Sequence, residues 1–143
     1  MIRTLIIAAL VCCVARFASA QAAPAADKRS AIEGTWERPT IDGAPGARQI
    51  KIINATHVVW AIIDAQKNTV VLTGGGTYTL KGNTYIEVLE FTSADSGLPD
   101  LIGKEQKFKV TVGKDSFKQV GKLTSGQEID ETWKRVVTQS STN

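Results

Sequence analysis

The chain has little cysteine and histidine, and its cysteine is confined to one end. Both cysteines, Cys12 and Cys13, lie within the first 20 of 143 residues, and there is a single histidine. Residues 1–20 combine a basic start, a short apolar run and the small residues Ala18-Ser19-Ala20, which is the layout of a cleaved secretory signal peptide. Without that segment the chain has no cysteine, which excludes disulfides, thiolate metal ligands and a cysteine nucleophile.

The chain also lacks a strong charge of one sign and a long hydrophobic run. Its formal net charge is +3, and loss of Arg3 and Arg16 with the signal peptide leaves 15 basic and 14 acidic residues, or +1. That balance does not suit bulk electrostatic binding of nucleic acid. The apolar run Leu5–Val14 is well short of the roughly 20 residues of a membrane-spanning helix. We therefore expect an exported protein, periplasmic or secreted, with no transmembrane segment and no nucleic-acid partner.

A lipoprotein signal is the other interpretation of this segment. Such a signal places a small residue directly before a cysteine that becomes lipidated. Cys12 follows Val11 and Cys13 follows Cys12, so neither has Gly, Ala or Ser before it. Plain cleavage after Ala20 fits better.

Strand signals dominate between two polar ends. Residues 21–30 are predicted to be a flexible tether and residues 138–143 a disordered tail, leaving one domain over residues 31–137. Within it, runs rich in Val, Ile, Thr and aromatic residues alternate with Gly, Asn and Asp turn signals. We expect eight strands: Ile32–Arg38, Arg48–Ile53, His57–Asp64, Thr69–Leu80, Thr84–Phe91, Lys104–Val112, Ser116–Leu123 and Glu128–Val137.

Short links between these runs predict their arrangement. Lys81-Gly82-Asn83, Gly113-Lys114-Asp115 and Thr124-Ser125-Gly126-Gln127 each join consecutive runs, and links of this length make sequential antiparallel neighbours. An open meander of eight strands would leave two exposed edges, which closure removes. The predicted fold is therefore all-β, an eight-stranded antiparallel up-and-down barrel, wide enough to be filled by side chains or to hold one small ligand.

The first and last runs carry a family resemblance. Gly34-Thr35-Trp36 followed, at the end of the domain, by Trp133-Lys134-Arg135 resembles the calycins, which include the lipocalins and the fatty-acid-binding proteins. The resemblance implies that Trp36 closes one end of the barrel with Arg135 packed across its indole, a cation–π contact, and that Gly34 lets the first strand bend. A wider string resembles the bacterial exported lipocalin-like proteins of unknown function: Gly34–Arg38, Thr56-His57, Trp60, Gly74–Leu80, Tyr85, Glu87 and Trp133–Arg135.

The chain departs from both better-known families. It lacks the cysteines of lipocalins and a clear C-terminal helix. Pro39–Ala47 is a loop sequence, where fatty-acid-binding proteins have a helix pair. The ligand residues of those families are therefore not carried over to this chain.

Glu87 is the side chain of greatest interest. Residues 84–91 alternate without showing which face points inward. An inward Glu87 would need a partner or a raised pKa, which is typical of binding sites. The structural alternatives are a hydrogen bond to Tyr78, Tyr85 or Arg48, or exposure to solvent.

Three other features have a structural interpretation. His57 has no cysteine or carboxylate cluster to complete a metal site, and no motif supports it in a catalytic triad. Gly74–Gly76 indicates a bulge or sharp bend in a strand. The link Thr92–Gly103 holds Leu98 and other apolar residues that either form a lid over a barrel opening or plug the core.

We expect a monomeric exported protein that binds a small, partly apolar molecule inside the barrel, with no cofactor, no metal and no catalytic residues. One alternative is an interaction or inhibitor module that acts through the outer face of His57–Asp64 and the lysines of residues 104–122. Another is an enzyme that uses Glu87 and a tyrosine as an acid–base pair. The predicted cavity residues are Trp60, Tyr78, Tyr85, Glu87, Phe91, Phe108, Phe117 and Glu131.

Overall fold

The computed structural model describes residues 31–41, 43–94 and 96–137. The predicted signal peptide (1–20), tether (21–30) and tail (138–143) lie outside these described residues. No helix in the described part of the chain is long and apolar enough to cross a membrane.

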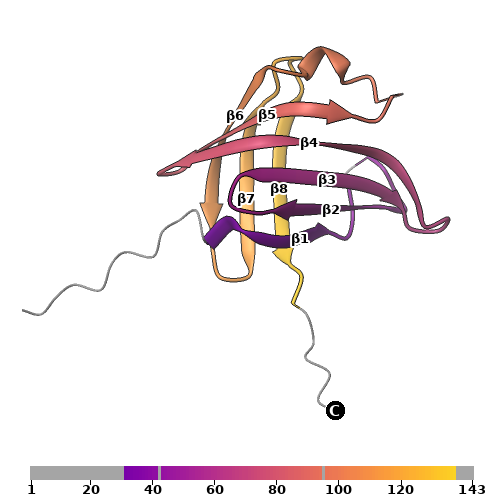
Figure 1. The fold of residues 1–143 in the computed structure, drawn as a ribbon. Helices are drawn as coiled ribbons and strands as arrows, with labels where there is room; N and C mark the ends of the chain where they lie inside the picture. Colours follow the sequence, from indigo (N-terminus) through magenta and orange to yellow (C-terminus); the bar gives the residue numbers. More distant parts are fainter. Residues whose placement is uncertain (1–30, 42, 95, 138–143) are drawn as a thin grey trace, which may run out of the picture.

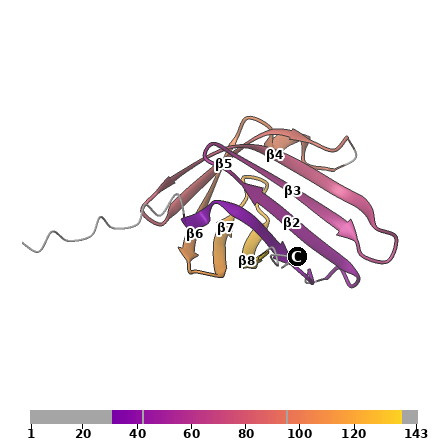
Figure 2. The same ribbon diagram turned by 60° about the horizontal axis from the view of Figure 1, so that its bottom comes forward.

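The described residues form a closed barrel in which every strand pairs with its neighbours in sequence, from β1 to β8 and back to β1 (Figure 1). The predicted all-β, eight-stranded antiparallel up-and-down barrel is confirmed. In Figures 1 and 2, β1–β4 cross β6–β8 at a wide angle. The strands are β1 Gly34–Arg38, β2 Ala47–Ile53, β3 His57–Asp64, β4 Thr69–Lys81, β5 Thr84–Thr92, β6 Glu105–Val112, β7 Ser116–Lys122 and β8 Glu128–Arg135.

The two terminal strands are shorter than expected. β1 begins at Gly34 instead of Ile32, and β8 ends at Arg135 instead of Val137. The Ile32 side chain is nevertheless fully buried, and its carbonyl accepts a hydrogen bond from the Trp36 indole at 2.8 Å. The residues before β1 therefore contribute to the core without pairing in the sheet.

The three glycines of β4 allow close backbone approach. β4 runs through Gly74–Gly76 without a break, and its pairing with β5 shifts register between Gly75 and Gly76. A Cβ on Gly76 would collide with the backbone of Val88 on β5. A register shift therefore occurs at the expected glycines, and its extra residue lies on β5 opposite them.

Side chains inside the barrel form layers along its axis. At one end, which we call the packed half, large buried aromatic residues pack against one another in the interior. Phe117 stacks on Trp133 with ring centroids 6.1 Å apart, and Trp36 meets Phe117 edge-on at 5.3 Å. The fully buried aromatic side chains there are Trp36, Tyr85, Phe117 and Trp133.

The link between β5 and β6 covers the opposite end, the cavity half. It contains a short 3-10 helix, η1, over Pro99–Leu101, and Leu101 is buried. A parallel bridge joins Leu89 to Ile102, and the Gly103 amide donates to the Leu89 carbonyl at 2.8 Å. The link is therefore attached to the wall of the barrel by backbone hydrogen bonds.

The outer surface of β2–β5 is less covered than the sequence suggests. An apolar β3 on both faces indicates a covered outer side, yet Val59 is 40% exposed and its cross-strand neighbour Ile52 is 53% exposed. Both residues are only partly covered by other described residues. The apolar outer side chains stay accessible to solvent.

Candidate ligand cavity

A cavity of about 290 Å³ occupies the cavity half of the barrel. Its size lies at the lower limit of small-molecule sites in proteins, about 300 Å³. Strands β2–β8 and the β5–β6 link all contribute to its lining. The lining residues are Gln49, Lys51, Trp60, Ile62, Leu72, Glu87, Leu89, Ser96, Leu98, Leu101, Gln106, Phe108, Gln119, Leu123, Gln127, Ile129 and Glu131.

Apolar side chains make most of the wall. Leu98 and Leu101 approach from the link, while Leu72 and Leu89 come from adjacent strands. The link was expected to form either a lid or a core plug. Leu101 is 3% exposed and lines the cavity, so the link roofs an open space and packs into the interior at the same time.

Four of the eight predicted cavity residues line the cavity: Trp60, Glu87, Phe108 and Glu131. Tyr85 and Phe117 point inward but are fully buried in the packed half. Tyr78 is also buried there, and its hydroxyl donates to the Asn54 carbonyl at 2.8 Å. These three residues support the cavity from below without bordering it.

The prediction that Phe91 lines the cavity is wrong, because Phe91 lies on the outer surface and is 45% exposed. Strict alternation from Tyr85 through Leu89 would point Phe91 inward. The register shift instead pairs Leu89 with Gly76 and Phe91 with Gly75, which leaves one extra residue on β5. A bulge of this kind reverses the side-chain direction that follows it. The Phe91 ring consequently lies over Gly75 on the outside.

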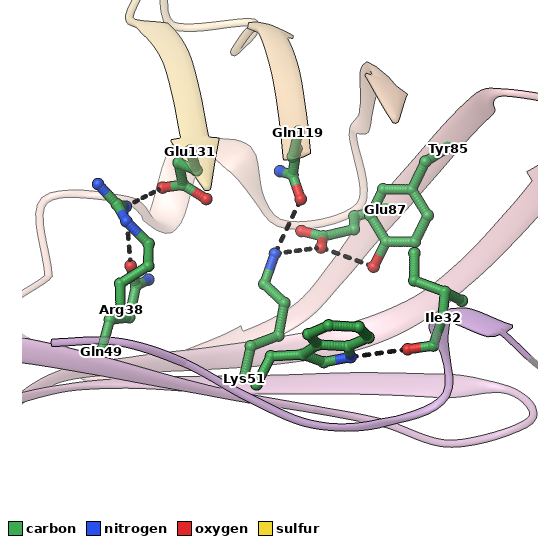
Figure 3. Close-up of polar contacts among 9 residues, drawn as sticks. Ile32, Arg38, Gln49, Lys51, Tyr85, Glu87, Gln119 and Glu131 are labelled. Atoms are coloured by element: carbon green, nitrogen blue, oxygen red, sulfur yellow. Dashed lines mark hydrogen bonds and ion pairs between the residues drawn. The ribbon is translucent and has the colours of Figure 1, made fainter. Parts of the chain in front are cut away.

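A buried ion pair between Lys51 and Glu87, which both line the cavity, forms its floor next to the packed half. Figure 3 shows its contacts. The Lys51 ammonium donates to Glu87 Oε1 at 3.1 Å and to Gln119 Oε1 at 3.0 Å. The Tyr85 hydroxyl donates to the same Glu87 oxygen at 2.8 Å. Exposure is 2% for Lys51, 5% for Glu87 and 3% for Gln119. The partner that a buried Glu87 requires is therefore a lysine, together with one of the predicted tyrosines.

Lys51 also lies among aromatic rings of the packed half. Its Nζ is 4.9 Å from the Trp133 ring centroid and 5.7 Å from that of Phe117. Ring faces attract a cation, and more strongly where water is excluded. The ammonium is thus held by a carboxylate, an amide, the indole of Trp133 and the phenyl ring of Phe117.

The pKa of Tyr85 is raised well above its ordinary value of 10.0. Burial is the main cause, followed by the negative charge of Glu87 and the hydrogen bond to it. The hydroxyl therefore stays protonated at neutral pH and donates to the carboxylate. Tyr85 does not border the cavity, so its hydroxyl is shielded from a molecule bound there.

A second polar cluster lies on the side wall at the seam between β1 and β8. One Arg38 nitrogen, Nη1, donates to Glu131 Oε1 at 2.8 Å and to Gln49 Oε1 at 3.1 Å. Only Trp36–Arg135 and Glu37–Lys134 pair across this seam. The Arg38–Glu131 ion pair therefore joins the two strands beside the cavity, where backbone pairing has ended.

A third polar contact secures the wall near the β7–β8 turn. Gln106 is 1% exposed, and its amide nitrogen donates to the Lys104 carbonyl at 3.2 Å and to Thr124 Oγ1 at 3.1 Å. The Thr124 amide donates back to Gln106 Oε1 at 2.8 Å. Gln106 is thus fully occupied in holding the turn against β6.

The expected contact between Trp36 and Arg135 is present next to the seam of β1 and β8. The Arg135 guanidinium lies 4.1 Å from the Trp36 ring centroid and donates to the carbonyls of Glu33 and Ala31 at 2.8 and 2.7 Å. Gly34 has a φ of +137°, and a Cβ there would lie 2.5 Å from Arg135 Nη1. Glycine is favoured because other residues rarely adopt this backbone angle, and a Cβ would displace the Arg135 guanidinium.

The remaining candidates lie on the surface. Lys107, Lys118 and Lys122 form ion pairs with Glu105, Asp130 and Glu128 at 2.9–3.1 Å, on or beside their own strands. The exposed His57 ring contacts the Thr56 hydroxyl at 2.7 Å. The described residues contain no group of three or more metal-ligating side chains.

Sequence reasoning missed Lys51, Gln49 and Gln119. In β2 these polar residues alternate with Ile50 and Ile52, so hydrophobic patterning favours turning the isoleucines inward. The structure does the opposite, because Gln49 and Lys51 share a face with the fully buried Ile53. The available signal was the requirement of Glu87 for a cationic partner.

Comparisons of this chain with protein-family models, with curated proteins and with solved structures gave no match. The barrel and its cavity therefore carry the functional inference.

Proposed function

We propose that this chain is an exported, lipocalin-like protein that binds a small, partly apolar molecule inside its barrel. The observation that carries the proposal is the preformed cavity, which joins an apolar wall to a buried polar floor. Small-molecule sites combine these two features, since apolar surface supplies affinity and a few polar groups supply orientation.

The contrast with the packed half supports this function. Large aromatic side chains fill the barrel up to Lys51 and Glu87, whereas beyond them space remains. A buried ion pair is seldom better for stability than apolar residues of the same volume. Polar groups kept at the boundary of an open space are instead suited to recognise a ligand.

A second candidate function rests on the apolar outer face. Ile52, Val59, Gly75 and Phe91 are successive cross-strand neighbours over β2–β5. Their three side chains are 40–53% exposed. Such a row can bind a partner protein, as the interaction hypothesis requires. The lysines of that hypothesis favour it less, because three of them already form ion pairs with nearby carboxylates.

Native mass spectrometry of the protein purified from the organism that makes it tests the proposal. We expect a retained small molecule in the wild type and none in Leu72→Trp, which fills the cavity. Val71→Trp is the matched control, because the neighbouring Val71 is 63% exposed, and it should retain the molecule.

Absence of any adduct from the wild type, or its retention by Leu72→Trp, would contradict binding inside the barrel. A protein complex that survives Leu72→Trp but is lost on Ile52→Asp would favour the outer face.

A further inference from the structure

The charges and unused hydrogen-bonding atoms of the floor indicate what kind of ligand fits. We infer that the ligand carries a neutral polar head that both donates and accepts hydrogen bonds, such as a hydroxyl or a carboxamide, on an apolar body. This inference rests on the proposed function and specifies the chemistry of the same cavity.

The charges around the cavity already balance. The charged lining residues are Lys51, Glu87 and Glu131. Lys51 pairs with Glu87 at 3.1 Å, and Glu131 pairs with Arg38 at 2.8 Å. A ligand carboxylate would bring a second negative charge next to Glu87, and a ligand ammonium would bring a second positive charge next to Lys51. An unpaired buried charge is costly in either case, so the floor disfavours both.

The floor also leaves one acceptor and one donor unused. Lys51 and Tyr85 both donate to Glu87 Oε1, and no described residue donates to Oε2. Gln119 accepts from Lys51 through Oε1, while its Nε2 donates to no described residue. An ammonium has only donors, so it requires the amide oxygen and turns the amide nitrogen away from itself. In Figure 3, no dashed contact reaches the second Glu87 oxygen or the Gln119 nitrogen.

These two atoms face the cavity. Glu87 and Gln119 both line it. Among the described residues, the one enclosed side-chain polar atom without a partner is Trp133 Nε1. Glu87 Oε2 and Gln119 Nε2 are therefore accessible from the open space. A head that donates to the first and accepts from the second completes the floor without adding charge.

Volume and wall define the body of the ligand. With about 30 Å³ for each non-hydrogen atom, the share of one water in the liquid, a cavity of about 290 Å³ holds roughly ten such atoms. Leu72, Leu89 and Phe108 surround that space with apolar surface. A nine-carbon chain whose head has one or two non-carbon atoms is a suitable probe.

Isothermal titration calorimetry at pH 7 with four probes that differ only in the head tests the inference. The probes are nonan-1-ol, nonanamide, nonanoate and nonylammonium. We expect the two neutral probes to bind at least tenfold more tightly than either charged probe. Equal or tighter binding of a charged probe overturns the inference on the head while leaving the cavity as a binding site. No binding of any probe contradicts both proposals.

Two variants of nearly unchanged shape alter the charge of the floor in opposite directions. Glu87→Gln leaves the Lys51 ammonium without its carboxylate, so nonanoate should become the preferred charged probe by at least tenfold. Gln119→Glu adds a carboxylate beside Lys51, so nonylammonium should become the preferred charged probe by a similar factor. Asp130→Asn, which removes the carboxylate of the exposed Lys118–Asp130 pair, is the control and should keep the wild-type order.

Circular dichroism verifies that each variant is folded. If Glu87→Gln does not fold, Gln119→Glu, which keeps the Lys51–Glu87 pair, still tests the inference. An unchanged order of the four probes in a folded variant would show that the head does not reach this floor.

Discussion

The packed half and the cavity half of the barrel share most of their strands, yet different side chains point into them. In the packed half, inward positions carry Trp36, Tyr85, Phe117 and Trp133, whose rings fill the barrel by stacked and edge-on contacts. In the cavity half, inward positions carry mainly aliphatic side chains and amides, with Trp60 and Phe108 among them, and about 290 Å³ remains open. The comparison suggests that stability is concentrated at one end and recognition at the other.

Truncating a large side chain in each half tests this division most strongly. Phe117→Ala should lower the free energy of unfolding by about 4 kcal/mol, because a fully buried ring leaves a cavity in a close-packed layer. Leu72→Ala, which enlarges an existing space, should cost no more than about 2 kcal/mol. Urea denaturation followed by tryptophan fluorescence measures both. Equal costs would contradict the division.

Breaking the ion pair at the boundary should have the next largest effect. Lys51→Met leaves Glu87 buried without its cation and should lower stability by about 3 kcal/mol. The double variant Lys51→Met/Glu87→Gln removes both charges and should recover most of that loss. The same denaturation series gives the coupling between the two sites. A double variant as unstable as the single one would show that the pair itself stabilises the fold.

Adding volume to the interior should also affect the two halves unequally. Val110→Phe enlarges a buried residue of the packed half and should cost about 2 kcal/mol through strain. Leu123→Phe projects into the cavity and should change stability by less than about 1 kcal/mol. Thermal unfolding by circular dichroism distinguishes the two. A large loss for Leu123→Phe would mean that the cavity does not accept additional atoms.

The smallest expected effect is a loss of stability at high pH. The pKa of Tyr85 is raised in the folded protein by burial and by Glu87, so the unfolded chain loses this proton first. The stabilisation that the protonated Tyr85 hydroxyl contributes to the folded state is present below about pH 10 and is lost as the pH rises further. The wild type should lose more stability than Tyr85→Phe between pH 9 and 11 in matched urea titrations. Identical losses would contradict this role of Tyr85.

Much of the fold was predictable because local patterns decide it. Short Gly- and Asn-containing links made consecutive strands antiparallel neighbours, and β3 begins and ends at His57 and Asp64 as expected. Closure followed from the edges that an open sheet would expose. The contact of Arg135 with Trp36 could be predicted only from the family resemblance, because the two residues are about a hundred positions apart in the sequence.

The candidate site was predictable only in part. Glu87 was named as a cavity candidate that would need a partner if it pointed inward, and the structure buries it beside Lys51. Lys51 was missed because β2 buries its polar face, a choice that the alternation of Ile50 and Ile52 argues against. Phe91 was misplaced because the glycines of β4 indicate a bulge without showing that its extra residue lies on β5, where it reverses the side-chain direction.

By itself, the amino-acid sequence determined the number of strands, their order and their antiparallel pairing, because turn residues and alternation act over only a few positions. The tertiary structure alone decided which face of β2 and which end of β5 point inward, and so brought Lys51 to Glu87 from 36 residues away. Burial of a charge depends on what surrounds it in space. For this reason the neutral, amphipathic floor of the cavity emerges only when the barrel is closed.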